Sequence, residues 1–167
     1  MAAAPFPAAV VAEACAEVRA RLRMVGTGED ALVARAVQGA LGLAEAYTRQ
    51  ALVVREHVAV MTAASEWRAL PVVPVRSIAG GAAVAAIDID GDGTGWVRMA
   101  TSGEVRFAAG LAEGWGDLPP AVAQGVVLLA AHLFETRGGE GVPPAAVGAL
   151  WRPWRRMRIG SARRCGG

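Results

Sequence analysis

The chain has 167 residues, a length that suits one domain of ordinary size. Hydrophobic residues make up 54% and charged residues 19%, and this composition excludes a disordered tail. All 17 basic residues are arginine, and they are unevenly placed. Residues 1–140 hold 11 Arg against 15 Asp and Glu, which gives a formal charge of −4. Residues 141–167 hold six Arg and no acid, which gives a formal charge of +6. The net charge of +2 therefore conceals an acidic body with a basic C-terminal end.

Two further classes of protein are disfavoured. No segment reaches the roughly 20 apolar residues that a transmembrane helix needs. The start of the chain carries Pro5, Pro7 and Glu13 and lacks the positive region of a secretory signal.

Cys15 and Cys165 lie near opposite ends and match no metal-binding spacing. We therefore expect a reducing compartment and no cofactor.

Two helices are predicted in the N-terminal part. Residues 8–24 form the first, because apolar side chains recur at spacings of 3 and 4. Residues 30–50 form the second, with Thr27 or Asp30 as its cap. Gly39 and Gly42 in this helix predict a close contact with another helix. The expected apolar faces are Val11, Cys15, Val18 and Leu22 for the first helix, and Leu32, Ala36, Ala40, Leu43 and Tyr47 for the second.

Residues 51–115 have the character of strands. Short Val- and Ile-rich runs alternate with glycine turns at residues 80–81, 91–95 and 102–103. Pro71 and Pro74 bracket a segment that we expect to be an edge strand or an extended connector. The predicted strands are residues 52–61, 75–78, 82–89, 96–99 and 104–107.

Helices return in the C-terminal part. Pro119 and Pro120 favour a helix start, and the run that follows to residue 137 is apolar nearly all round, so this helix should be the buried centre. A last helix is predicted for residues 143–157. The fold class is α+β, mainly α: a small helical bundle with a strand-rich insertion at about 51–115. Residues 1–150 are expected to form one domain and residues 151–167 an extended arm.

The segment DIDGDGTG, residues 88–95, resembles the first half of a calcium loop. Asp88, Asp90 and Asp92 hold the first three ligand positions, but the position of the bidentate glutamate is Met99. A glycine-rich hairpin turn with solvated aspartates explains the same residues and is favoured. A weak cation site at these three aspartates is the alternative.

The chain has only two histidines, His57 and His132. Neither has a serine or cysteine neighbour in the sequence that suggests a catalytic triad. We expect that the protein is not an enzyme.

The C-terminal segment WRPWRRMRIG combines two tryptophans with four arginines and no acid. This composition suits nucleic acid, a membrane surface or a protein partner. The candidate binding residues of this segment and the tail are Trp151, Arg152, Trp154, Arg155, Arg156, Arg158, Arg163 and Arg164.

The order of these elements resembles the head–tail connector (adaptor) family of tailed bacteriophages. The resemblance covers most of residues 10–158. It rests on the Leu-Pro-Pro helix start at 118–120, the His-aromatic-Glu-x-Arg element at 132–137, the Pro-led last helix at 142–144, and the aromatic-Arg pair Trp154-Arg155. The Glu-x-Tyr-Thr element at 45–48 and the Pro-x-x-Pro strand entry within 70–78 agree with it. The alanine-rich, lysine-free composition suits the adaptor of a gene transfer agent.

The resemblance implies a structural role rather than catalysis. Such adaptors form a ring, commonly a dodecamer, under the portal protein of a filled head, and bind a downstream stopper or tail protein. DNA passes through the channel without specific binding, and no membrane takes part. The implied location is the head–tail interface of a particle assembled in the bacterial cytoplasm, and by position residues 151–167 are the portal-binding arm. The alternative is a nucleic-acid-binding module that uses the same basic tail.

Overall fold

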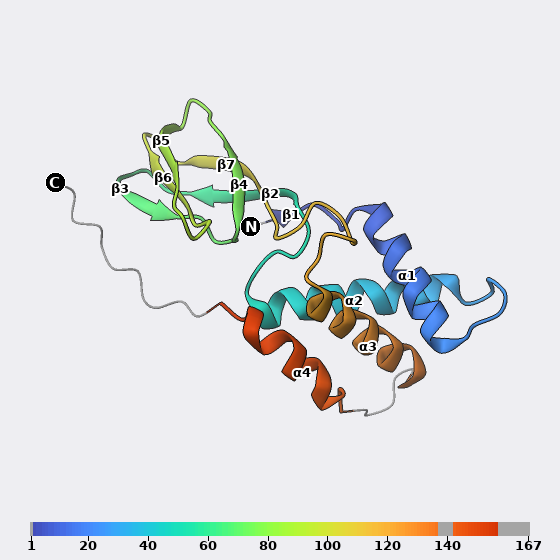
Figure 1. The fold of residues 1–167 in the computed structure, drawn as a ribbon. Coiled ribbons are helices and arrows are strands. Elements are labelled where there is room, and N and C mark those ends of the chain that lie inside the picture. Colours follow the sequence, from blue (N-terminus) through green and yellow to red (C-terminus); the bar gives the residue numbers. More distant parts are fainter. Residues whose placement is uncertain (1, 137–141, 157–167) are drawn as a thin grey trace.

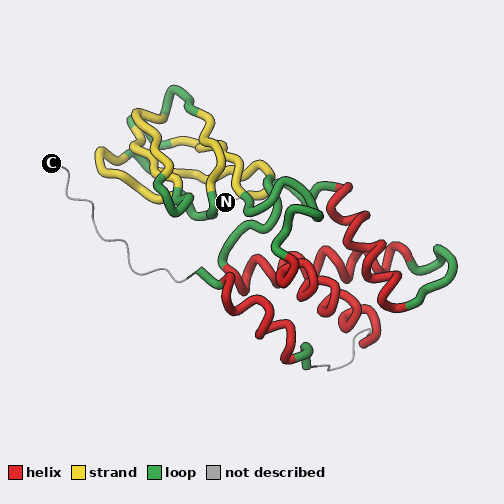
Figure 2. Tube along the Cα trace, in the orientation of Figure 1, coloured by secondary structure: helices red, strands yellow, loops and turns green. Residues whose placement is uncertain are grey.

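Helices and strands occupy opposite ends of the molecule in the computed structural model, which describes residues 2–136 and 142–156 (Figures 1 and 2). The helical end is built from residues 8–48 and 120–154, and all strands except β1 (Ala2–Ala3) come from the segment between them, as predicted. The predicted α+β fold with a strand-rich region is therefore confirmed.

The helical bundle contains α1 (Ala8–Leu22), α2 (Asp30–Thr48), α3 (Pro120–Thr136) and α4 (Ala145–Trp151), and a 3₁₀ turn, Arg152–Trp154, comes after α4. α1 and α2 end where Arg23 and Arg49 adopt the left-handed conformation, with φ of 52° and 58°. The last helix is shorter than predicted, because Pro153 has no N–H to donate to the helix. No helix in the described ranges is long and apolar enough to cross a membrane.

The strands form two antiparallel sheets. One has the order β1-β2-β7-β4 and the other β3-β6-β5. Two strands were not predicted, β1 and β3, because neither shows an alternation of apolar and polar residues. The bounds are β1 (Ala2–Ala3), β2 (Arg55–Met61), β3 (Ala64–Ala69), β4 (Val75–Ala79), β5 (Val84–Ile89), β6 (Gly95–Met99) and β7 (Gly103–Ala109).

Each end of the molecule has its own apolar core. The helical core surrounds α3, whose Val122, Val126 and Ala130 are fully buried, so the predicted central position of this helix is confirmed. The core between the strands centres on residues such as Val97 and Val105.

The predicted core face of α2 is wrong in part. Leu32 and Leu43 are 43% and 50% exposed, whereas Val33, Val37 and Leu41 are fully buried. Both sets recur at helical spacing, so the periodicity alone does not decide which set faces the core.

The expected use of two glycines in α2 is also not found. A Cβ at Gly39 would meet Leu133 at 3.8 Å, an ordinary contact, and a Cβ at Gly42 would meet no described atom within 4 Å. Neither glycine therefore brings two helices of this chain unusually close.

Candidate functional site at the base of the C-terminal arm

Trp151, the first residue of the predicted arm, lies inside the helical bundle. Its side chain is 3% exposed, and its Nε1 donates a hydrogen bond to the Val122 carbonyl at 3.2 Å. Its ring packs on Tyr47 with 5.8 Å between the ring centroids, and the Tyr47 hydroxyl donates to the Gly148 carbonyl at 3.3 Å. Trp151 therefore anchors the C-terminal segment inside the bundle and is not an exposed binding group.

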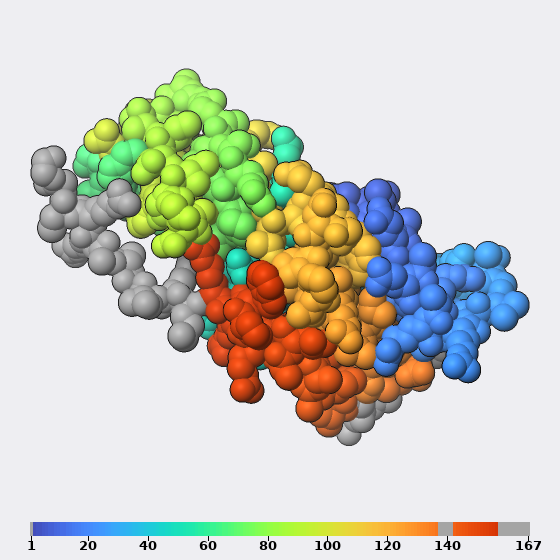
Figure 3. Space-filling view, viewed as in Figure 1, coloured from blue at the N-terminus to red at the C-terminus, as the bar shows by residue number. Residues whose placement is uncertain are grey.

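The chain after Trp151 is attached to the end of α2 by hydrogen bonds. Gln50 Nε2 donates to the Trp154 carbonyl at 2.6 Å, and the Arg156 N–H donates to the Thr48 carbonyl at 2.9 Å. The Arg156 guanidinium also donates to the Asp92 carbonyl in the turn between β5 and β6. The base of the arm therefore bridges the bundle and the strand region, and in Figure 3 its red atoms meet the yellow-green atoms of that region.

The predicted binding arginines differ in their surroundings. Arg152 and Arg155 are exposed, and the Arg155 guanidinium carbon lies 5.9 Å from the Tyr47 ring centroid, in cation–π range. Trp154 and Arg156 are half-buried. Arg158, Arg163 and Arg164, and Arg137 of the earlier motif, lie outside the described residues.

A buried ion pair joins the bundle to the strand region on the other side of α2. Arg55 donates to both carboxylate oxygens of Glu45 at 2.7 Å, and these side chains are only 8% and 17% exposed. Glu45 Oε1 also accepts the Leu52 N–H at 2.8 Å. Arg55 further donates through Nε to the Ala4 carbonyl at 3.1 Å and lies over the Phe6 ring at 4.5 Å. The Glu45–Arg55 pair thus holds the start of β2 and the N-terminal segment to α2.

These contacts meet at the last turn of α2 and the residues just after it, which we call the junction: Glu45, Tyr47, Thr48 and Gln50. In the sequence, Glu45 to Thr48 supported a family resemblance, and of these four residues only Tyr47 received a role, as part of the expected core face of the helix. In the structure each has a separate partner, and Thr48 is fully buried with its hydroxyl donating to the Ala44 carbonyl at 2.7 Å. The signal in the sequence was a group of polar residues that follows the apolar run Gly39–Ala44 at the end of the helix.

The DIDGDGTG segment is the turn of the β5–β6 hairpin. Asp90 Oδ1 accepts the N–H groups of Asp92 and Thr94 at 3.0 and 2.8 Å, and its Oδ2 accepts Trp96 Nε1 at 2.8 Å. Gly93 takes the left-handed φ of 72° that the turn requires. Burial tends to raise the pKa of Asp90, but these hydrogen bonds outweigh it and hold the pKa below the ordinary value. The geometry favours the hairpin turn, and Asp88 stays exposed.

The titratable side chains of the described ranges do not gather into a metal-binding cluster. Within residues 2–136 and 142–156, no three His, Cys, Asp or Glu side chains gather to hold a metal ion. His57 is 2% exposed and stacks on Phe107, and neither of its ring nitrogens has a hydrogen-bond partner among the residues that the structure describes. Burial lowers the pKa of His57, and the Arg55 charge lowers it further against the opposite effect of Glu45.

Comparison with known proteins gives likenesses to solved structures. No protein-family model and no curated protein sequence matches the chain. The neck of an empty gene transfer agent (GTA) particle, computed with C6 symmetry, contains a chain that is 26% identical, with a TM-score of 0.72. A chain in the neck of a native GTA particle, computed with C12 symmetry, is 25% identical with a TM-score of 0.73. A chain in the native GTA virion is 25% identical with a TM-score of 0.67. Each match covers 98% of this chain and 100% of the other. The predicted resemblance to a connector of a gene transfer agent is confirmed.

Proposed function

We propose that this chain is the head–tail adaptor of a gene transfer agent or a related phage-like particle. Twelve copies form a ring beneath the portal protein, join the DNA-filled head to the tail, and leave a central channel. The observation that carries the proposal is the likeness over 98% of the chain to proteins of two GTA necks, which were computed with C6 and C12 symmetry. Closed cyclic symmetry requires repeated contacts between identical copies.

In this proposal residues 155–167 bind the portal protein. They carry five arginines and no acid, which suits an acidic partner surface. The contacts of Trp154 and Arg156 with Gln50 and Thr48 support the assignment, because they hold the start of the arm in one direction. A docking arm that leaves from a fixed point loses less conformational freedom on binding.

The rest of the chain suits a channel through which DNA passes without being held. Residues 2–136 contain 10 Arg and 14 Asp and Glu, so this part is acidic. Like charges repel the phosphate backbone, which limits nonspecific binding. On the tail side the ring presents a surface for a stopper or tail protein. The protein then acts at the head–tail interface of a particle assembled in the bacterial cytoplasm.

The test is a truncation after Arg156, which removes residues 157–167 and keeps Trp151 and the junction contacts. We expect a subunit with unchanged thermal unfolding that no longer co-sediments with portal protein. The matched control replaces Arg68, Arg98 and Arg106 by alanine, which removes an equal number of positive charges, three, from the exposed strand surface. Normal portal binding by the truncated chain contradicts the arm assignment. Duplex-DNA binding that needs the arm and weakens steeply with salt favours a nucleic-acid-binding module instead.

A further inference from the structure

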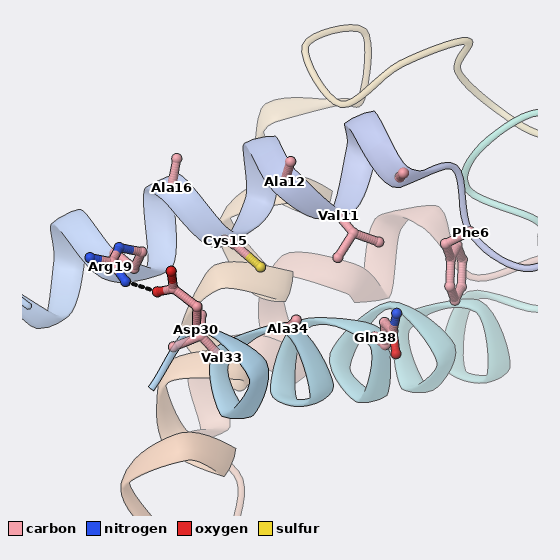
Figure 4. A pocket seen from close by; sticks show the side chains of 11 residues that line it. Phe6, Val11, Ala12, Cys15, Ala16, Arg19, Asp30, Val33, Ala34 and Gln38 are labelled. Carbon is pink, nitrogen blue, oxygen red and sulfur yellow. Dashed lines mark hydrogen bonds and ion pairs between the residues drawn. The ribbon is translucent and has the colours of Figure 1, made fainter. Parts of the chain in front are cut away.

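A groove of about 560 Å³ runs between α1 and α2 (Figure 4). Val11, Cys15 and Ala34 give it an apolar lining. Phe6 lies at one end, and the ion pair between Arg19 and Asp30 lies at the other. Cys15, predicted to be a core residue, is only half-buried and faces this groove, so the apolar stripe of α1 extends beyond the core.

The first half of α1 combines small exposed side chains with acidic ones, and arginines follow in its last turn. Ala12 and Ala16 are exposed along the groove, whereas Glu13 and Glu17 are exposed but do not line it. Small residues allow the axis of another helix to come close. Glu17 accepts a hydrogen bond from Trp115 Nε1 at 2.7 Å, whereas Glu13 is exposed and forms no ion pair within the described ranges.

The outer face of α4 has the complementary character. Its exposed residues Ala145, Ala146 and Ala149 are small and uncharged, and the exposed Arg152 lies on the same side, seven residues after Ala145. α1 and α4 both pack on α3 and lie on opposite sides of it in Figure 1. One chain therefore carries an apolar groove beside a helix whose first half bears Glu13 and Glu17 and whose last turn bears Arg19 and Arg21 and, across the bundle, an uncharged helix with a positive end.

We infer that α4 of one copy packs on the α1–α2 groove of the next copy, with Arg152 of the first beside Glu13 of the second. The inference rests on the proposed ring. A ring needs two different surfaces that fit each other, and in a twelve-fold ring neighbours are turned by about 30°, so the surfaces must lie on nearly opposite sides of the subunit. The α1 groove and α4 meet that condition, and Glu13 in the first half of α1 and Arg152 after α4 carry opposite charges.

The test is disulfide trapping between neighbours. Cys15→Ala and Cys165→Ser remove the natural thiols, and Ala16→Cys with Ala149→Cys places one thiol on each surface. After mild oxidation of assembled particles, a non-reducing gel should show a ladder in steps of 17.1 kDa. The matched control combines Ala149→Cys with Ala100→Cys, an exposed position beyond β6, and should stay monomeric.

The result separates two failures. A ring seen by electron microscopy without the ladder, or with the ladder only in the control, overturns the interface and leaves the proposed function standing. A neck that does not contain a ring of this chain overturns both.

Charge reversal gives a second measure: Glu13→Arg and Arg152→Glu should each lower incorporation into particles at least tenfold, and the double variant should recover it. Loss that the double variant does not repair contradicts the proposed pairing.

Discussion

Gly125 of α3 and Trp151 of α4 are in a contact that no larger residue at position 125 permits. A Cβ on Gly125 would lie 2.2 Å from Trp151 Nε1 and 2.8 Å from the neighbouring indole carbon Cε2. The missing side chain lets the indole reach the Val122 carbonyl and fill the core beside Tyr47. The attachment of the arm to the bundle therefore depends on one glycine.

Gly125→Ala should displace Trp151 and lower the free energy of unfolding by about 3 kcal/mol, the upper range for overpacking a core. Thermal unfolding followed by tryptophan fluorescence measures both effects. The control is Gly42→Ala, in the open and exposed part of α2, which should raise the stability by up to about 1 kcal/mol. Equal effects of the two substitutions would mean that the indole does not occupy the space at Gly125.

Glu45→Gln leaves the guanidinium of Arg55 buried without its counter-charge. We expect a loss of about 3 kcal/mol, as for other broken buried pairs, together with loosening of the strand region. Denaturant unfolding gives the energy, and hydrogen exchange of β2 locates the change. Glu104→Gln removes the exposed pair with Arg106, 3.8 Å apart, and should cost less than about 0.5 kcal/mol. A small effect at Glu45 would contradict its role in joining the two parts.

His57 predicts a dependence of stability on pH. Its pKa in the folded state is lowered from 6.5 by burial, so the unfolded chain takes up the proton first as the pH falls. The free energy of unfolding should therefore decrease below about pH 6.5 and level off once the folded state is also protonated. His57→Leu should remove this decrease and match or exceed the wild type at pH 7, since both ring nitrogens lack partners. A variant that keeps the same pH profile would exclude His57 as its source.

Asp90 should stabilise the β5–β6 turn through its three hydrogen bonds. Asp90→Asn presents an N–H to Trp96 in place of an acceptor, and we expect a loss of about 1 kcal/mol. Asp88→Asn, at an exposed position, is the control and should have no measurable effect. The pKa of Asp90 is lower in the folded state than its ordinary value of 3.8. The contribution of the ionised carboxylate to the free energy of unfolding is therefore complete above pH 3.8 and is lost as the pH falls through the folded pKa.

Calcium provides a separate check on this loop. The oxygens of Asp90 already accept three hydrogen bonds, so millimolar Ca²⁺ should leave the melting temperature and the Trp96 fluorescence unchanged. A calcium-dependent rise in the melting temperature that Asp90→Asn abolishes would favour the cation site over the hairpin turn.

The sequence alone determined the order of the main elements and the uneven charge. A helix that is apolar nearly all round has to be central, and the structure places α3 there. The β5–β6 turn was equally readable, because Asp and Gly residues act within a few positions of one another. The match to connector motifs also depended only on local patterns and their order.

Tertiary structure decided what depends on distant partners. α2 carries two apolar stripes, and only packing against α1 and α3 selects Val33 and Val37 over Leu32 and Leu43. Two alanines became β1 because β2 offers a partner edge. Trp151 was predicted to be an arm residue from its neighbours, but Gly125 places it in the core. Tyr47 and Gly148 meet although they are 101 residues apart, and no local pattern encodes such a contact, because its energy exists only when both segments are already folded.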